Sequence, residues 1–406
     1  MKKIKFFYGV PEYFPAWRLD VSHLFGEQLS KRGLDISWCM WRDTKGPYEV
    51  LDSQNGQEIN LPLSFGRNRL WNRILNRFSY VLCELPLFAK MVMVKYDVIQ
   101  ARDLRYSMAL LGLVAARLTG AKFTYWLSYP FPEHYLEMSS NKRGLARLIR
   151  LAQGTISFWF VYKWLMHRAD HVFVQSEQMK EDVANYGVTR QKMTSVPMGV
   201  PPALLRWKQN NSNSIVAGRI VYVGTLASIR KLEMLIEAFS YIVKKNDTAT
   251  LVMVGDGDVP SEKEFLEAEA LRLGVADRIT FTGFIAMEEA WDYAASAAVC
   301  VSPFYPTFVL RSTSPTKLNE YFALGRPVVA NDHPEQSTAI AESGAGICVP
   351  WGAKEFSDAI QQLLDDPLGA EKMAAKGPGW VRKNRSYDGI ADDVISVYRD
   401  ILKNNE

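Results

Sequence analysis

The chain has few of the features that define several common classes of protein. Its 406 residues include only four cysteines, widely spaced and without a CxxC pair. This spacing argues against structural zinc and against a disulfide framework, and it fits a reducing compartment. No apolar stretch approaches the ~20 residues that cross a bilayer. The longest, roughly 155–166, is interrupted by Lys163. We therefore expect a cytoplasmic protein without a membrane-spanning helix.

Other recognition motifs are also lacking. No GxGxxG opens a helix after a strand, which disfavours a dinucleotide-dependent oxidoreductase. No nucleic-acid recognition motif is present, so no nucleic acid partner is expected. The N-terminus has a basic start but no long apolar core and no small-residue cleavage site, which favours a first strand over a signal peptide. Asp256 and Asp258 form a DxD pair, but the glycines around them are more typical of a tight turn, and we expect no metal site.

Charge is distributed unevenly along the chain. The net charge is +4, yet residues 1–200 carry 27 Lys and Arg against 17 Asp and Glu. The remainder of the chain is therefore acidic overall. An excess of positive charge in one half favours an anionic partner for that half.

Basic and large apolar residues alternate in two stretches, residues 67–78 and 142–168. At helical spacing this pattern predicts helices that lie on an anionic membrane surface. The alternative is a helix with its apolar face in the domain core and its arginines in solvent. The basic residues are Arg67, Arg69, Arg73 and Arg77 in the first stretch, and Lys142, Arg143, Arg147, Arg150, Lys163 and Arg168 in the second.

Strand and helix patterns alternate from end to end. Short apolar runs such as 98–100 and 250–254 predict strands, and the amphipathic runs between them predict helices. This alternation is typical of parallel sheets covered by helices. Pro201, Pro202 and the polar run 209–214 predict a linker. We expect an α/β protein with two doubly wound domains facing a central cleft, where ligands bind at the carboxyl ends of strands.

Most of the chemistry lies in one segment of the second half, RSTSPTKLNEYFALGRPVVAN. Ser314 is expected to cap a helix that Pro315 opens and Gly325 ends. The amides of a helix start favour an anion, and Lys317 adds a positive charge beside them. Glu320 lies three residues later on nearly the same face, where it can accept hydrogen bonds from vicinal ribose hydroxyls. The arrangement predicts a nucleotide-diphosphate site; a capped helix with a Lys–Glu surface pair is the alternative.

A second segment of the same half supports a phosphate site. Gly224 and Thr225 follow a predicted strand, 219–222, and Arg230 precedes the next helix. A short loop of small residues with a guanidinium at the carboxyl end of a strand can hold a phosphate bidentately. A solvated arginine at a helix start is the alternative.

In combination these segments resemble the retaining glycosyltransferases of family 4, which have the GT-B fold. The matching pieces of the second half are YVGTLASIRKLEMLIEAF, LVMVGDGD, RITFTGF and SPTKLNEYFALGRPVVANDHPEQ. The first half adds VQSEQMKEDVANYGV and SVPMGV. The resemblance implies two Rossmann-like domains, an acceptor-binding domain over 1–203 and a nucleotide-sugar-binding domain over 204–385. It also implies that a final helix, 386–406, crosses back onto the first domain.

The resemblance carries over to single residues. It implies that Arg230 contacts the donor diphosphate, that Glu320 binds ribose, and that the amides around Ser314–Lys317 hold phosphate and donor sugar. The implied donor-binding set is Gly224, Thr225, Arg230, Ser314, Thr316, Lys317 and Glu320.

The sequence departs from the family pattern at four places. Ser312 stands where the first of two paired glutamates is expected, and Thr225 where an arginine is frequent. Gly9 is what remains of an N-terminal glycine-rich loop. Ser128 replaces a histidine at the end of a strand. These departures bear on the donor-sugar contacts and on the catalytic part of the first domain.

The expected activity is sugar transfer from a nucleotide diphosphate sugar to a hydroxyl acceptor, with retention and without cofactor or metal. Arg230 and Lys317 would stabilise the leaving diphosphate. His134 is the candidate for a catalytic or acceptor-binding role, with a purely structural histidine as the alternative. Charge pattern and family together favour a polyprenyl-linked saccharide acceptor at the inner face of the cell membrane, in bacterial surface-polysaccharide assembly. A nucleotide-sugar epimerase and a non-catalytic, membrane-associated assembly subunit are the competing hypotheses.

Overall fold

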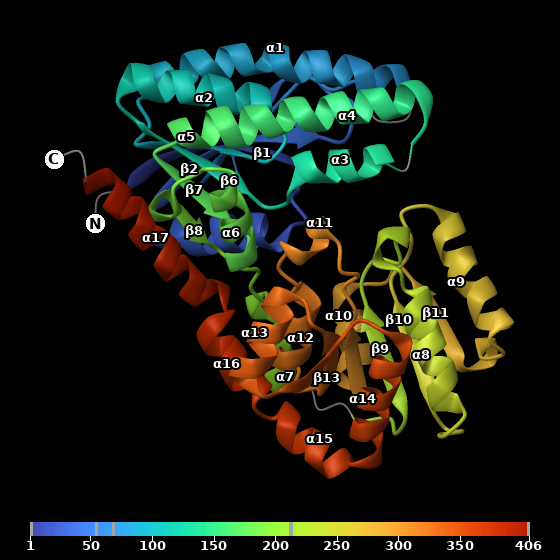
Figure 1. The fold of residues 1–406 in the computed structure, drawn as a ribbon. Coiled ribbons are helices and arrows are strands. Elements are labelled where there is room, and N and C mark those ends of the chain that lie inside the picture. The colour runs from blue at the N-terminus through green and yellow to red at the C-terminus, as the bar shows by residue number, and fades with distance from the viewer. Residues whose placement is uncertain (1–2, 53–55, 67–69, 141, 211–213, 404–406) are drawn as a thin grey trace. The chain divides into compact units, whose positions relative to one another are not determined.

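The computed structural model describes residues 3–52, 56–66, 70–140, 142–210 and 214–403 (Figure 1). The chain forms two compact units. The N-terminal unit is Met1–Pro197 together with Ile390–Glu406, and the C-terminal unit is Met198–Gly389. Each unit is a sheet of mostly parallel strands with helices packed against it, so the predicted α/β class is confirmed.

The division between the units lies a few residues from the predicted limits of 203/204 and 385/386. Pro201 and Pro202, which the sequence predicts to open a linker, lead into helix α7 (Pro202–Asn210) of the C-terminal unit. Proline suits this place because the backbone amides of the first helical turn have no carbonyl partner within the helix. The amide that proline lacks is therefore not missed. The start of the predicted linker is thus helical, Ser214 has no regular structure, and residues 211–213 lie outside the described residues.

The N-terminal unit contains an eight-stranded sheet in the order β3-β4-β2-β1-β5-β6-β7-β8, parallel except between β3 and β4. Its strands are β1 (Ile4–Phe14), β2 (Leu34–Arg42), β3 (Glu49–Asp52), β4 (Glu58–Leu61), β5 (Val98–Arg102), β6 (Lys122–Leu127), β7 (His171–Val174) and β8 (Met193–Ser195). Its helices are a π-helical segment (Asp20–Leu29), α1 (Leu70–Val94), α2 (Tyr106–Thr119), α3 (Phe131–Ser140), α4 (Gly144–Phe158), α5 (Met166–Arg168), which a second π-helical segment (Trp159–Leu165) joins to α4, and α6 (Glu177–Asn185).

The side chains of successive residues of β1 point to opposite faces of this sheet, because side chains alternate along a strand. Phe7 belongs to a core that includes residues of α1 and α2, the helices that cover one face (Figure 1). Phe6 lies on the other face, where its ring is 5.1 Å from that of Tyr398.

Tyr398 belongs to α17 (Tyr387–Lys403), the last helix of the chain. Its hydroxyl donates a 2.6 Å hydrogen bond to Gln100 of β5, and its ring packs 5.1 Å from that of Phe173 of β7. Helix α17 therefore packs against the second face of the N-terminal sheet.

The C-terminal unit contains a six-stranded sheet in the order β11-β10-β9-β12-β13-β14, parallel throughout. Its strands are β9 (Arg219–Val223), β10 (Thr250–Val254), β11 (Ile279–Gly283), β12 (Val299–Ser302), β13 (Val328–Asn331) and β14 (Gly346–Val349). Its helices after α7 are α8 (Glu233–Val243), α9 (Pro260–Arg272), α10 (Met287–Ala295), α11 (Phe308–Arg311), α12 (Thr316–Ala323), α13 (Pro334–Ser343), α14 (Ala353–Asp365), α15 (Pro367–Ala374) and α16 (Gly377–Asn384).

The carboxyl ends of β9, β12 and β13 meet at one edge of this sheet, because the three strands are parallel neighbours. Helix α12 is attached to the same edge: the Val223 amide at the end of β9 donates a 2.7 Å hydrogen bond to the hydroxyl of Tyr321. The fold thus brings the loop after β9 and helix α12 together at the edge where ligands of such sheets bind.

Candidate donor-binding site

Gly224 lies where the two predicted donor-binding segments approach each other. Its φ is +146°, and a Cβ there would lie 3.2 Å from the Tyr222 hydroxyl and 3.3 Å from Cε of Lys317. A side chain at this position would be strained by the backbone and crowded by the lysine. Glycine therefore lets the loop after β9 lie directly against α12.

Lys317 is only 6% exposed, although it is a lysine in the first turn of a helix. Its ammonium lies 4.5 Å from the ring centre of Tyr222 and 4.7 Å from that of Phe304. Nζ also donates a 3.3 Å hydrogen bond to the Tyr222 hydroxyl. Aromatic faces stabilise a cation, but they do not neutralise it.

The charge of Lys317 has no carboxylate partner. None of the ion pairs among the described residues includes its ammonium. Burial, with the charge of Arg230 acting in the same direction, holds the pKa of Lys317 well below its ordinary value, and Glu320 opposes this only partly. A buried cation without a counter-ion is costly, and a bound anion would remove that cost.

Arg230 approaches the same place from the turn Ser228–Arg230 before α8. Its Nε donates a 2.8 Å hydrogen bond to the hydroxyl of Thr225, and its guanidinium lies 5.5 Å from the ring centre of Phe304. One of its terminal nitrogens, Nη1, is buried and has no hydrogen-bond partner in the described part of the chain. The guanidinium therefore keeps a donor available for a ligand.

Helix α12 begins differently from the prediction. Ser314 does not cap it: the cap residue is Pro315, and no side chain satisfies the first amides. The Ser314 hydroxyl instead donates to Glu335 at 3.0 Å and accepts from the Met198 amide at 3.0 Å. The prediction of a serine cap is wrong, because long-range partners occupy the hydroxyl. The amides of the first turn, with Thr316 half-buried at its start, are consequently left for an anion.

Two further positions lie on either side of α12. Gly325 lies just beyond its end in the left-handed region, with a φ of +65°, as predicted for a terminating glycine. Ser312, at the place of the first paired glutamate, is buried, and its hydroxyl donates 3.5 Å to the Phe308 carbonyl.

Glu320 lies one turn beyond Lys317 and is half-buried. Burial raises its pKa to about 7, and the charge of Lys317 lowers it in part. Its carboxylate has no hydrogen-bond partner among the described residues. A desolvated, unpartnered carboxylate beside a buried cation is able to accept hydrogen bonds from hydroxyl groups of a ligand.

Sequence reasoning did not identify the aromatic part of this site. Tyr222 comes from β9, and Phe304 follows β12 and is fixed by two hydrogen bonds of its backbone to the Asn331 side chain, 2.7 and 2.9 Å long. Aromatic residues in apolar strands are normally read as core. Both residues lie at or just beyond the carboxyl end of a parallel strand, the edge where ligands of such sheets bind, and this position could have identified them.

The remaining candidates lie in the N-terminal unit. Ser128 follows β6, and Asp103 accepts from both its amide at 2.7 Å and its hydroxyl at 2.5 Å. Arg102 forms an ion pair with Asp103, at 3.1 Å, inside the unit. His134 lies on α3, with its Nδ1 3.1 Å from the Tyr129 hydroxyl. Burial, with the charge of Arg150, lowers the pKa of His134, so its ring is neutral at pH 7.

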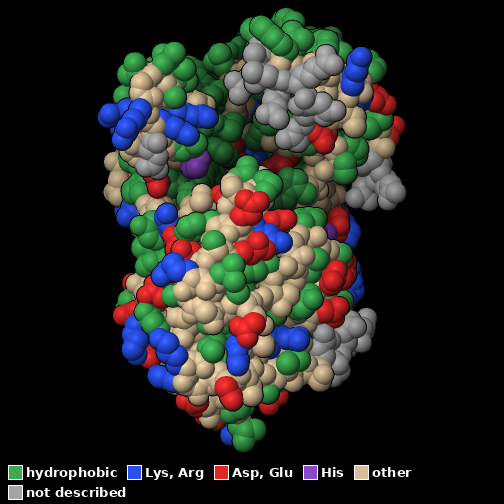
Figure 2. Space-filling view, turned by 90° about the vertical axis from the view of Figure 1, so that its right-hand side faces the viewer, with side chains coloured by type: hydrophobic (Ala, Val, Ile, Leu, Met, Phe, Trp, Pro, Cys, Tyr) green, Lys and Arg blue, Asp and Glu red, His purple; other side chains and the backbone are tan. Residues whose placement is uncertain are grey.

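The two basic stretches form helices, but only part of the first can be described. Arg67 and Arg69 lie outside the described residues, as do the side chains of Arg73 and Arg77. Helix α4 exposes both apolar and basic side chains. Leu145 is 72% exposed, Leu148 is 61% exposed, and basic residues beside them are exposed as well. Figure 2 shows hydrophobic side chains over the top of the N-terminal unit, with lysines and arginines beside them. The exposed set comprises Trp71, Phe78, Leu82, Leu145, Leu148, Ile149, Ile156 and Trp159, with Lys142, Arg143, Arg147, Lys163 and Arg168.

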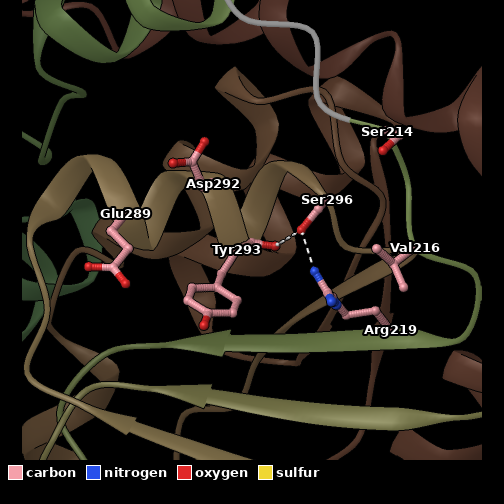
Figure 3. A pocket seen from close by; sticks show the side chains of 7 residues that line it. All are labelled: Ser214, Val216, Arg219, Glu289, Asp292, Tyr293 and Ser296. Carbon is pink, nitrogen blue, oxygen red and sulfur yellow. Dashed lines mark hydrogen bonds between the residues drawn. The ribbon is translucent and has the colours of Figure 1, made fainter.

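A separate hollow of about 540 Å³ in the C-terminal unit lies away from these residues (Figure 3). Arg219, the first residue of β9, lines it and donates a 2.9 Å hydrogen bond to Ser296. Gly224 follows the opposite end of the same strand, so this hollow is not part of the donor-binding site.

The DxD segment forms a turn. The Gly257 amide donates to the Asp256 carboxylate at 2.9 Å, and the Asp258 amide donates to Glu262 at 2.8 Å. Across the described residues, no group of three His, Cys, Asp or Glu side chains is arranged to hold a metal ion.

Comparison with known proteins agrees with this geometry. The family described as glycosyl transferases group 1 matches residues 217–366, and the one described as glycosyltransferase family 4 matches residues 21–204. An alpha-monoglucosyldiacylglycerol synthase of Streptococcus pneumoniae is 26% identical over 66% of this chain and 59% of its own length. The chain spans about half the length of the curated relatives it matches.

Solved structures show the fold. A sucrose-phosphate synthase of Thermosynechococcus elongatus has a TM-score of 0.73 at 18% identity, covering 98% of this chain and all of the other. HepE of Anabaena, in complex with UDP-glucose, has a TM-score of 0.66 at 15% identity, again covering 98% of this chain and all of its own.

Proposed function

The chain belongs to the family 4 glycosyltransferases, with the GT-B fold, and on that premise we propose that it transfers a sugar from a nucleotide diphosphate sugar to a hydroxyl acceptor with retention. The observation that carries the proposal is Lys317, a buried ammonium held between two aromatic rings without a carboxylate partner among the described residues. A diphosphate is the partner that this ammonium, the open amides of α12 and the buried nitrogen of Arg230 have in common.

Different site residues bind different parts of the donor. The diphosphate lies against Lys317, Arg230 and the start of α12, beside the loop that Gly224 allows to approach the lysine. Glu320 accepts hydrogen bonds from the ribose. As the bond from the anomeric carbon to the diphosphate lengthens, negative charge grows on the phosphate oxygens. Preorganised cations and amides in a dry site stabilise that charge without having to reorient.

The N-terminal unit receives the acceptor. Its surplus of positive charge suits a phosphate-bearing acceptor, and a polyprenyl-linked saccharide is the class we propose. The Streptococcus pneumoniae relative is by name a synthase of a glucosyl lipid, which supports a lipid acceptor. His134, neutral at pH 7 by the lowering of its pKa, is the candidate to accept the proton of the acceptor hydroxyl.

The exposed apolar and basic side chains of α4 favour attachment to an anionic membrane surface, which we place at the inner face of a bacterial cell membrane. No helix in the described residues is both long and apolar enough to cross a bilayer. The proposed attachment is therefore peripheral, and surface-polysaccharide assembly is the process in which this combination of donor, acceptor and membrane fits.

Incubation with a panel of UDP-, GDP- and ADP-sugars tests the proposal. Slow release of free nucleotide, with water replacing the acceptor, is the expected result. Formation of sugar isomers would indicate an epimerase instead, and absence of nucleotide binding would indicate a non-catalytic subunit.

The matched control for this experiment is Lys231, the exposed lysine beside Arg230. Lys317→Met should lower nucleotide release about 10²–10³-fold, whereas Lys231→Met should leave it intact. Equal activity of the two variants would contradict the assignment of the site.

A further inference from the structure

A second hollow, of about 520 Å³, lies wholly within the N-terminal unit. Helix α1 forms one wall, and α3 and α4 contribute the other; the loop between β5 and α2 lies between them. The upper part of Figure 2 is hollowed in this way, with hydrophobic side chains on both sides. The lining residues used below are Trp41, Tyr80, Val81, Glu84, Arg105 and Tyr106.

One polar group in this lining is buried and incompletely satisfied. Glu84 of α1 is 2% exposed, and its Oε1 accepts a 2.6 Å hydrogen bond from Arg105. Its second oxygen, Oε2, is buried and has no hydrogen-bond partner within the described chain. Arg105, in contrast, has several acceptors: it also donates to the carbonyls of Val10 and Cys39 at 3.2 and 3.0 Å. The ion pair fixes the carboxylate and leaves one of its oxygens for a donor from outside the chain.

Five of the twelve lining residues are aromatic, and Asn76, Ser107 and Gln153 add polar groups. The rings of Trp41 and Tyr80 stack with centroids 5.8 Å apart, which holds both in place. Tyr106 packs edge-on against Phe160 at 5.5 Å. Rigid aromatic faces beside one buried acceptor suit a ring that is apolar on its faces and carries hydroxyl groups on its edge, as a sugar is.

Exposed apolar side chains form part of the rim of the hollow, where Arg150 also contacts the lining residues Gln153 and Tyr135. Val81 lines it from α1, and its neighbours Leu82 and Leu85 are exposed on the same helix. Ile149 is exposed on α4, one turn before the lining residue Gln153. A ligand held by its polar end at Glu84 would therefore meet hydrocarbon side chains where it leaves the protein.

We infer that this hollow binds the head group of an amphipathic glycolipid, with a sugar hydroxyl donating to Oε2 of Glu84, the sugar ring against the aromatic lining, and the hydrocarbon chain leaving over the apolar rim. The inference rests on the proposed function, because it gives the acceptor of the transferase its binding site and its class. It adds Glu84 as a residue that determines acceptor specificity.

Octyl glucoside below its micelle concentration is a suitable probe, and its affinity is measured by calorimetry on the full chain. Glucose alone and octanol alone should each bind at least tenfold more weakly, since each lacks half of the contacts. Glu84→Gln and Tyr80→Leu should each weaken octyl glucoside about tenfold, through loss of the charged acceptor and of the stacking face. Met93→Gln, on an exposed position of the same helix, is the matched control.

Four results separate the possibilities. Octanol binding as tightly as octyl glucoside, or unchanged affinity in both Glu84→Gln and Tyr80→Leu with native far-UV circular dichroism, would overturn the inference. A protein that binds nucleotide sugar but not octyl glucoside would also overturn it while leaving the transferase proposal intact. A protein that binds octyl glucoside through Glu84 but no nucleotide would refute the transferase and keep the glycolipid site.

Discussion

The two units bury positive charge in opposite ways. In the N-terminal unit, Arg102 is fully buried and has two carboxylates, Asp20 at 2.6 Å and Asp103 at 3.1 Å. In the C-terminal unit, Lys317 is nearly as buried, yet it forms no ion pair within the described residues. A protein gains nothing in stability from a buried, unpaired ammonium. The contrast indicates that the first charge holds the fold together, whereas the second awaits a ligand.

The largest expected effect comes from removing a carboxylate partner of Arg102 in the N-terminal unit. Asp20→Ala leaves Arg102 short of its closer carboxylate, and the free energy of unfolding should fall by about 3–5 kcal/mol. Asp392→Ala, which removes an exposed ion pair with Arg32 in the same unit, should cost about 1 kcal/mol or less. Urea unfolding followed by tryptophan fluorescence measures both. Equal losses would remove the distinction between buried and exposed pairs.

The same pair makes stability depend on pH. Burial raises the pKa of Asp20, but the charges of Arg102 and Arg18 outweigh it and leave the pKa well below its ordinary value. A depressed carboxyl pKa stabilises the fold above its unfolded value of about 4, and that stabilisation is lost as pH falls further. The stability difference between the unmodified protein and Asp20→Ala should therefore shrink below about pH 4.

Lys317→Met should affect stability in the opposite direction to Asp20→Ala. Its free energy of unfolding should stay the same or rise, because a desolvated charge is replaced by an apolar side chain. Nucleotide release should fall about 10²–10³-fold, as for the loss of one preorganised contact to a leaving group. A marked loss of stability with unchanged turnover would show that this lysine is structural as well.

Glu320→Gln should weaken nucleotide binding by about 1.5–3 kcal/mol, the range for hydrogen bonds to a charged group. Because burial raises the pKa of Glu320 to about 7, the ionised acceptor is lost as pH falls through 7. Affinity of the unmodified protein should decline in that range, and affinity of the variant should not. Calorimetric titration at pH 6 and pH 8 distinguishes the two, and parallel pH profiles would contradict the ribose assignment.

The smallest effects concern the charged surfaces of the two units. Arg143→Glu combined with Arg147→Glu should reduce binding to phosphatidylserine vesicles by about 1 kcal/mol for each charge removed. The same reversal at Lys244 and Lys245, at the end of α8 in the C-terminal unit, should have little effect. Flotation of vesicles with bound protein measures this. An unmodified protein that never floats with vesicles would refute membrane attachment outright.

Sequence patterns predicted the fold well because they depend on local periodicity. The limits of β10 agree with the predicted run 250–254, and β5 and β9 start where the runs 98–100 and 219–222 predict, since each is a short apolar stretch. The meeting of Gly224 with Lys317 also follows from sequence reasoning, because parallel strands end at one edge. The antiparallel pair β3 and β4 was not predicted, since its strands are short and partly polar.

Long-range partners could not be predicted. The Ser314 hydroxyl engages Glu335 and the Met198 amide, both remote in sequence, and so it does not cap α12. The burial of Lys317 depends on Phe304, whose loop is fixed by Asn331 from another strand. A sequence shows which side chains carry charge, but the tertiary fold decides which of those charges is left without a partner.

The last helix has a consequence for how the chain acquires its structure during synthesis. Residues from Ile390 onward cover aromatic side chains of the first sheet, and the whole C-terminal unit is encoded before them. While a ribosome is still producing that unit, the rings of Phe6 and Phe173 lack their contacts with Tyr398. The earliest-made part of the protein therefore matures last, and it needs protection from aggregation until α17 emerges and docks.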